Sequence, residues 1–576
     1  MDMVGPPTLV LPEDSTEAQK VFNSLPIPGQ LDIVLQSRGK ERIRRIFLSE
    51  NPQALVQHLP EMEVFLTVKE VGERDAVDLI SLTTPEQFQF LLDLDLWGKD
   101  QLNPQKVFQW MEILLESGEE KVIQFIRSAD LEWIVLLLKK FLRVIPLEEE
   151  LLEARDRIPL FTLDQHYFID FKEKGAREVF QPFLEILYRV DHDLYRRSME
   201  SVIWELESEL EETNYRLRCG RLSDHGFPDF EEALEIYRFV PPDHLALEAG
   251  SVGISGPEEK GKDGPAFYLA FQNEGPFFSS LLFRVDEPSE RNRLRSEIVA
   301  LCNKALVAEA IDLSNLREIE GVMKKVFHYL NLGLQYLSKS DDVKAFEILR
   351  SSPVQKIFQA GVSATVLLRR KAESILKGPW FRGDRENLLF LDPPYFEKMG
   401  GLLRKRPGFY RDGVVEDFRN VQDLREAEVF LESIETIVNI FEKELRIHPL
   451  RLKELDLKGC YPTEWQGITC STILLTSLAN QILRGFFRFE AIERAELGDL
   501  FLRIFEKDGE GKGVVKMEIR KGLKEWFDSI EDEENRKQHL RAFGDFCLDL
   551  LEEEYGRIVA GEEIDPRFVK GLLIRT

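Results

Sequence analysis

The chain has 576 residues, of which 43% are hydrophobic and 31% are charged. This mixture is typical of soluble globular proteins, and the length predicts about three or four domains, so a disulfide-stapled mini-protein is excluded. Acidic residues number 103 and basic residues 76, which gives a net charge of −27 and disfavours general binding to nucleic acids, because the phosphates are repelled.

The cysteines and the apolar stretches indicate the compartment. Five cysteines without a C-x-x-C pair are expected to be reduced thiols in the cytoplasm. The N-terminus lacks the basic and apolar regions of a secretory signal. Residues 133–138 and 473–483 are too short or too interrupted for the roughly 20 residues that span a bilayer. No membrane span is therefore predicted.

The N-terminal part of the chain predicts a helical array. A Pro-rich leader at 1–29 precedes residues 30–144, where apolar residues recur three or four positions apart. Proline is tolerated in a first helical turn, and Asn or Thr ahead of it can cap the helix. Helix starts are expected at Asn51-Pro52, Leu59-Pro60, Thr84-Pro85 and Asn103-Pro104. We interpret these segments as a solenoid-like array, with an irregular bundle as the alternative.

Residues 145–249 predict a central helical region with a small hairpin. Two apolar runs at 160–171 flank the turn-like Asp164-Gln165-His166. Gly220 is expected to end one helix, and Asp229 to cap the next. The Gly-, Ser- and Pro-rich segment 250–265 is interpreted as a flexible linker at a domain boundary.

The remaining chain again predicts helices. Residues 266–377 read as a helical domain in which 266–286 offer the alternative of short strands. An irregular segment, 378–422, separates them from a C-terminal helical domain at 423–576. The clearest helix is expected at 423–445, because apolar residues follow three-or-four spacing throughout. The fold class is therefore mainly α.

The sharpest motif is Asp392-Pro393-Pro394-Tyr395, preceded by four apolar residues. It resembles the D-P-P-Y signature of amino-group methyltransferases, and the resemblance implies that Asp392 and Tyr395 would hold a target amine beside a methyl donor at the end of a strand. The glycine-rich turn that binds the donor in that family is missing, as is the alternation of strands and helices. The alternative is a proline-fixed turn ahead of a helix.

Residues 506–518 resemble a calcium-binding helix-loop-helix. Glu506, Asp508 and Glu510 would occupy loop positions one, three and five, with Gly511 at the sharp turn. The carboxylate expected at position twelve is replaced by Met517, and Glu518 arrives one residue late. The pattern therefore favours a Gly-rich acidic turn over a metal site.

No other motif predicts a metal or a cofactor. The eight histidines include no pair spaced to place two ligands on one helical face. The common phosphate-binding loops and the nucleophile elbow of serine hydrolases are also missing. We predict no cofactor and no metal.

Two polar segments are candidates for binding. Arg216, Arg218 and Arg221 could hold a carboxylate or phosphate, but they are better explained as ion pairs with glutamates that lock two helices together. Residues 462–472 form either the polar lip of a pocket or the entry to a helix that packs small residues, and the second interpretation is favoured.

Three segments together resemble a functionally uncharacterised bacterial family, the domain of unknown function numbered 6178. They are R-L-x-D-x-G-F-P-D-F-x-E-A-x-x-I-Y (221–237), L-D-P-P-Y (391–395) and P-T-E-W-Q-G-I-T (462–469). The resemblance covers nearly the whole chain and implies a mostly helical bacterial protein without assigning a catalytic residue. Residues 40–144 also resemble the helical N-domain of magnesium transporters in helix length and Leu-Pro punctuation, which concerns the fold alone.

These observations favour a cytoplasmic interaction or scaffold protein whose helices present a groove to a protein partner. Nucleic acid is disfavoured as a partner. The alternative is a methyltransferase-like enzyme acting through Asp392 and Tyr395.

Overall fold

The computed structural model describes residues 15–98, 101–146, 160–241, 266–313, 315–507, 512–556 and 570–576. The chain divides into two compact units. Unit 1 comprises residues 1–238, 244–334 and 340–359, and unit 2 comprises 239–243, 335–339 and 360–576. The expected linker at 250–265 and the first half of the Pro-rich leader lie outside the described residues.

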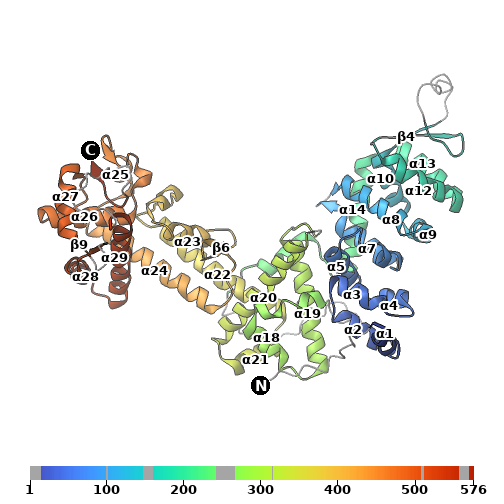
Figure 1. The fold of residues 1–576 in the computed structure, drawn as a ribbon, viewed down its shortest axis with the longest axis horizontal. Coiled ribbons are helices and arrows are strands. Elements are labelled where there is room, and N and C mark those ends of the chain that lie inside the picture. The colour runs from blue at the N-terminus through green and yellow to red at the C-terminus, as the bar shows by residue number, and fades with distance from the viewer. Residues whose placement is uncertain are drawn as a thin grey trace. The chain divides into compact units, whose positions relative to one another are not determined.

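Helices dominate the described chain, which confirms the mainly α prediction (Figure 1). Residues 15–241 contain α1 (Ser15–Asn23), α2 (Ile27–Leu35), α3 (Gly39–Ile46), α4 (Pro52–His58), α5 (Glu61–Val71), α6 (Val77–Ser81), α7 (Pro85–Asp95), α8 (Pro104–Glu116), α9 (Glu119–Ser128), α10 (Leu131–Phe141), α12 (Ala176–Val190), α13 (His192–Trp204), α14 (Glu207–Asp224), α15 (Phe230–Leu234) and the 3-10 helix η1 (Glu235–Tyr237).

The second half continues in the same way. Residues 266–402 contain α17 (Ala266–Leu269), η2 (Gln272–Glu274), α18 (Pro276–Phe283), α19 (Pro288–Ala308), α20 (Leu316–Ser338), α21 (Asp342–Ser351), α22 (Val354–Lys377), η3 (Arg385–Phe390) and α23 (Tyr395–Leu402). Residues 421–556 contain α24 (Val421–Lys443), α25 (Pro449–Lys453), η4 (Trp465–Gly467), α26 (Cys470–Arg484), η5 (Arg494–Glu496), α27 (Leu497–Ile504), α28 (Met517–Ile530) and α29 (Glu534–Tyr555).

The helix starts in unit 1 follow the local sequence. Asn51 accepts a hydrogen bond from the Ala54 N–H and caps α4, which begins at Pro52. Thr84 forms a capping box with Gln87 at the start of α7, and Asn103 caps α8. Each cap satisfies backbone N–H groups that would otherwise lack a partner. These predicted starts are confirmed.

The described strands form small sheets. The pairs are β1 (Trp97–Gly98) with β2 (Gln101–Leu102), β3 (Leu142–Pro146) with β4 (Tyr167–Phe171), β5 (Phe409–Arg411) with β6 (Val414–Glu416) and β9 (Phe505–Lys507) with β10 (Gly513–Val515), all antiparallel. A three-stranded sheet has the order β7 (Cys460–Tyr461), β11 (Ile574–Arg575), β8 (Ile492–Glu493).

Three local expectations need correction. The β element at 160–171 exists, but β4 pairs with β3, and Phe161 contributes a single bridge to Ile169. Residues 266–283 contain α17, η2 and α18 instead of strands, and Phe278, Leu281 and Leu282 are buried on one face of α18. The helix α14 does not end at Gly220 but continues to Asp224.

Unit 1 contains a charged pair inside its core. Arg42 on α3 and Glu63 on α5 are 1% and 0% exposed, and the guanidinium also donates to the Thr67 hydroxyl at 2.9 Å. Because every polar atom brought inside needs a partner, this network fixes how α3 and α5 pack.

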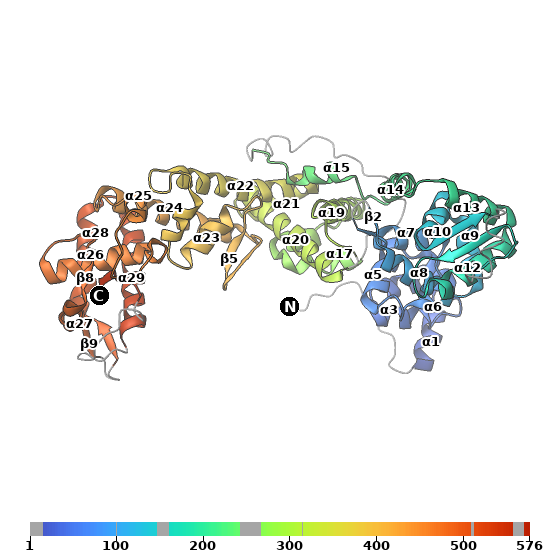
Figure 2. The ribbon, with the colours of Figure 1, turned by 90° about the horizontal axis from the view of Figure 1, so that it is seen from above.

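Unit 2 has its C-terminal core around α26. Cys470 to Asn480 are all buried there. α28 and α29 pack against each other, and α29 also contacts α24 and α26 (Figure 2). Thr476 accepts a hydrogen bond from the Leu573 N–H at 2.9 Å, which ties the C-terminal strand to this helix. None of the described helices combines the length and apolar character that a membrane span requires.

Candidate functional site

Asp392 joins two segments of unit 2. It follows η3 and lies 5% exposed, and its carboxylate accepts hydrogen bonds from the N–H of Ser471, at 2.9 Å, and from the Ser471 hydroxyl. Ser471 lies in the first turn of α26, so Asp392 acts as an additional cap on a helix 79 positions away. Burial raises the pKa of Asp392, and hydrogen bonds from Ser471 and Thr469 oppose this effect.

Tyr395 opens α23 and lies in an aromatic cluster. Its ring contacts Phe430, Phe543 and Phe546, with centroids 5.3 to 6.3 Å apart. Burial raises its pKa to about 12, so the phenol is protonated at neutral pH. The methyltransferase resemblance implies a strand directly before Asp392. The structure instead has the 3-10 helix η3 there, which ends at Phe390.

The thiols beneath this junction are protonated as well. Burial raises the pKa of Cys470 and of Cys547, and the charge of Asp392 adds to the effect at both. A thiol needs its thiolate form to attack a substrate or bind a metal. The junction of Asp392, Ser471 and these cysteines therefore has the character of a structural core.

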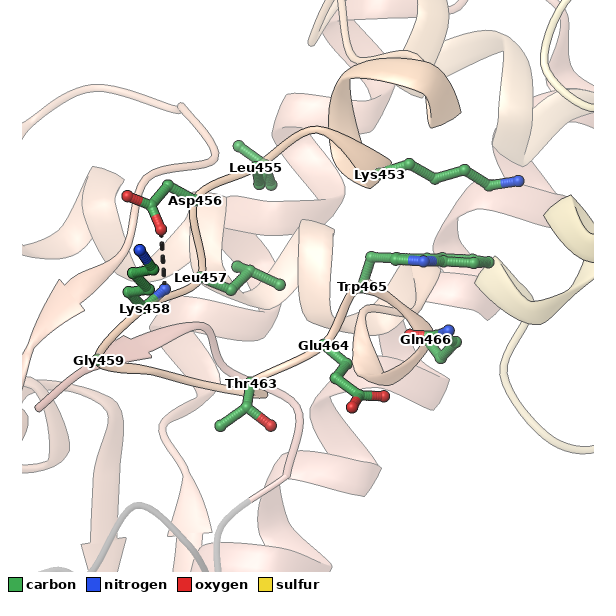
Figure 3. Close-up of a pocket in the computed structure, with 10 residues that line it drawn as sticks. All are labelled: Lys453, Leu455, Asp456, Leu457, Lys458, Gly459, Thr463, Glu464, Trp465 and Gln466. Atoms are coloured by element: carbon green, nitrogen blue, oxygen red, sulfur yellow. Dashed lines mark hydrogen bonds between the residues drawn. The ribbon is translucent and has the colours of Figure 1, made fainter.

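An open pocket lies beside this junction. Its volume is about 650 Å³, and it lies among α25, β7 and η4 (Figure 3). The lining residues are Lys453, Leu455, Asp456, Leu457, Lys458, Gly459, Thr463, Glu464, Trp465 and Gln466. Four of them belong to the segment 462–472, so this segment does line a pocket, as the first interpretation held. The helix-entry interpretation also holds, because Thr469 caps α26.

Lys453 and Trp465 form one wall of the pocket. The ammonium lies 4.7 Å from the centre of the Trp465 ring, and Figure 3 shows the lysine side chain lying along the indole. The Phe390 ring packs against Trp465 at 5.4 Å. A cation over an indole and an aromatic contact are both stabilising arrangements, so the ring is held in place.

Two acidic residues of the segment before Asp392 hold the Lys453 side chain in this wall. Lys453 donates to Asp384 at 2.9 Å and approaches Glu386 at 3.4 Å. The hydrogen bond from Lys453 to Asp384 raises the pKa of the lysine. The segments 391–395 and 462–469, two of the three that carried the family resemblance, meet where Thr469 hydrogen-bonds to Asp392.

The arginine cluster of α14 is located in unit 1. Arg221 binds Asp93 of α7 with two hydrogen bonds of 2.7 and 2.9 Å, and Arg218 donates to the Asp93 carbonyl at 2.6 Å. Burial lowers the pKa of Arg218; at Arg221 the same effect is outweighed by Asp93, and the pKa is raised. Arg216 is 72% exposed and pairs with Glu212. Arg218 and Arg221 therefore hold α14 against α7 through an aspartate rather than the expected glutamates, whereas Arg216 pairs within its own helix.

The loop that resembles a calcium site is only partly described. Asp508 and Glu510 lie outside the described residues. Glu506 lies in β9 opposite Val514 of β10, and Glu518 lies in the first turn of α28. Within the described part of the chain, no three His, Cys, Asp or Glu side chains are grouped for a metal ion.

Sequence reasoning missed the partners of these residues. Asp93 lies 128 positions from Arg221, and Asp384 lies 69 positions from Lys453. Neither carboxylate stands in a recognisable motif. The one signal in the sequence was that 391–395 and 462–469 both carry motifs of the family resemblance, which could have suggested that they lie close together.

The fold and the site define a mainly α-helical protein with an open pocket of polar and apolar lining in its second unit. The chain belongs to a family of unknown function (DUF6178), whose model matches residues 19–575. No curated protein and no solved structure matches the chain.

Proposed function

We propose that this chain is a protein-interaction or scaffold protein and that the pocket at 453–466 receives a segment of a partner protein. The observation that carries the proposal is the chemistry of the pocket rim. Leu455 is 40% exposed and Trp465 is half-buried, while Lys458 and Glu464 are exposed on the same rim. An apolar surface flanked by charges of both signs suits a peptide segment with an apolar side chain between polar neighbours.

The charged rim residues are available to a partner. The amine of Lys458 and the carboxylate of Glu464 have no hydrogen-bond or ion-pair partner among the described residues. The backbone beneath them is held: the Asp456 carboxylate accepts a hydrogen bond from the Lys458 N–H at 3.1 Å, as Figure 3 shows, and Gly459 accepts one from Thr576.

The pocket wall formed by Lys453 and Trp465 is preorganised by the contacts already described. Lys453 is fixed by Asp384, and the Trp465 ring is fixed by Phe390 and Lys453. A rigid site loses less conformational entropy when a ligand binds, so a shallow pocket of this kind can still give useful affinity. The five cysteines are all free thiols, which supports a reducing compartment such as the cytoplasm as the place of this interaction.

A site-specific cross-linking experiment tests the proposal. A photoreactive amino acid, benzoylphenylalanine, replaces the exposed Gln466 in the full chain, and cross-linking is carried out in the organism that encodes the protein. The control places the same amino acid at Glu525, which is 68% exposed on α28. We expect one reproducible protein adduct from position 466 that is absent from position 525.

A second variant links the adduct to the pocket wall. Trp465→Ala removes the aromatic surface and is expected to reduce the yield of the adduct by about thirtyfold, because aromatic anchors at the centre of an interface contribute about 2 kcal/mol or more. Absence of any adduct from position 466, or an adduct that Trp465→Ala leaves unchanged, would refute the proposal.

A further inference from the structure

A second feature of unit 2 is a basic turn that the pocket does not include. The basic turn comprises residues 403–406, between α23 and β5. Arg369 of α22 donates to the Lys405 carbonyl at 2.6 Å, and Arg385 of η3 approaches the Leu403 carbonyl at 3.4 Å. Three cationic segments that are separate in the sequence are therefore brought together.

The basic turn is held in one conformation. Gly401 accepts a hydrogen bond from the Gly408 N–H at 3.0 Å, and a Cβ at Gly401 would lie only 3.0 Å from the Gly408 carbonyl oxygen. This close approach, together with the two arginine contacts, fixes the backbone carbonyls of the turn. The side chains of Arg404 and Lys405 are exposed.

These exposed cations lack acidic partners. Among the described residues, neither Arg404 nor Lys405 has an ion pair, and Arg385 contacts only a carbonyl. Three carboxylates of unit 2 are committed to other cations: Glu373 to Arg369 at 3.3 Å, Glu432 to Lys371 at 3.1 Å, and Asp384 to Lys453 at 2.9 Å. A local positive surface thus remains on a chain whose net charge is −27.

We propose that the basic turn and Arg385 form a docking site for an acidic segment of a partner protein. A guanidinium presents two parallel N–H donors to a carboxylate, so Arg404 and Arg385 are suited to bind Asp and Glu side chains. The site uses no residue that lines the pocket, so this inference does not depend on the pocket.

The overall charge favours a short acidic segment over a nucleic acid. Electrostatic interactions between exposed charges extend over about 10 Å at 0.1 M salt. A short segment therefore interacts mainly with the basic turn. A longer polyanion would extend over the acidic remainder of the surface and be repelled.

Fluorescence anisotropy with a defined probe tests the proposal. The probe is a fluorescein-labelled ten-residue peptide of alternating Glu and Gly, titrated with the full chain at about 0.05 and 0.15 M salt, where screening differs. We expect saturable binding that weakens at the higher salt. The double variant Arg404→Glu/Lys405→Glu is expected to weaken binding by about tenfold or more, because two attractive contacts become repulsive.

A matched control separates local docking from net charge. The variant Arg74→Glu/Lys521→Glu makes the same change of charge at side chains that are 71% and 75% exposed elsewhere. It is expected to bind the peptide as the unmodified chain does. Far-ultraviolet circular dichroism verifies that both variants fold.

Three results would overturn the inference. The first is no binding to the unmodified chain at the lower salt, and the second is equal weakening by both double variants. The third is tighter binding of a single-stranded oligonucleotide of the same charge than of the peptide, which would reassign the basic turn to phosphate.

Discussion

The contact between Asp392 and Ser471 makes a quantitative prediction about unit 2. In Asp392→Ala the N–H and O–H of Ser471 lose their acceptors inside a buried junction. Each buried group left without a hydrogen-bond partner costs about 1–3 kcal/mol, so the loss of two acceptors is expected to lower the free energy of unfolding by about 2–6 kcal/mol. For a unit of this size that corresponds to a fall in Tm of roughly 5–15 °C.

The variant Asp392→Asn provides the matched comparison. Its amide oxygen can accept from the Ser471 N–H, and its NH₂ group can donate to the Ser471 hydroxyl oxygen, so most of the hydrogen bonding survives. It also removes the burial cost of the charge. We therefore expect a change of less than about 1.5 kcal/mol at pH 7.

The pH dependence has a definite sign. Burial raises the pKa of Asp392 in the folded state, so the folded chain takes up this proton at a higher pH than the unfolded chain. The unmodified protein should then gain stability relative to Asp392→Asn as the pH falls from 7 through the raised pKa, and the gain should be complete below the unfolded pKa of about 3.9.

Differential scanning calorimetry of the three proteins between pH 7 and 4 measures these effects. Equal destabilisation by Ala and Asn, or a loss below 0.5 kcal/mol in Asp392→Ala, would show that the hydrogen bonds to Ser471 do not hold the junction together. A loss of stability of the unmodified protein relative to Asp392→Asn as the pH falls would contradict the direction of the pKa shift.

Four further predictions follow from other sites. Asp93→Ala should cost about 1–3 kcal/mol in urea unfolding, because Arg221 loses both of its hydrogen bonds to the carboxylate while Arg218 keeps its bond to the backbone carbonyl, and the exposed Arg216→Ala should stay within 0.5 kcal/mol. Burial lowers the pKa of Lys121 from 10.5 to about 8. The free energy of unfolding of the unmodified chain should therefore rise by up to about 3 kcal/mol as the pH rises from about 8 to about 10.5, and that of Lys121→Met should not. Isothermal titration should detect no micromolar calcium site, and Asp508→Ala should leave the titration unchanged, because the position-twelve carboxylate is missing. S-adenosylmethionine at high micromolar concentration should leave the Tm unchanged, because the Asp392 carboxylate is already engaged by Ser471.

The sequence predicted those elements that local chemistry determines. The helix starts at Asn51, Thr84 and Asn103 depend on caps within three residues, and the helix α24 depends on a repeat along its own length. The predicted helix at 423–445 lies within two residues of the observed bounds. Such signals are contained in one segment, so one sequence reveals them.

Elements that depend on distant partners were predicted less well. The strand β4 pairs with β3, which lies more than twenty positions upstream and directly follows α10, so nothing in 160–171 points to it. The aromatic residues of 266–286 permitted strands, and burial on one face made them helices. Hydrophobic pattern alone does not separate short buried strands from short buried helices.

The candidate site shows the same division between local and distant information. The segment 462–472 was interpreted as a pocket lip or a helix entry, and both interpretations hold because Thr469 caps α26 while Trp465 lines the pocket. The two interpretations are compatible because a distant segment, 390–392, contacts both parts. Asp392 binds Ser471 at the start of α26, and Phe390 packs against Trp465, so the helix start also supports the pocket wall. A residue that stabilises this junction therefore also shapes the surface that a partner would meet, so substitutions there are expected to change stability and binding together, whereas Lys458 and Glu464 on the rim should change binding alone.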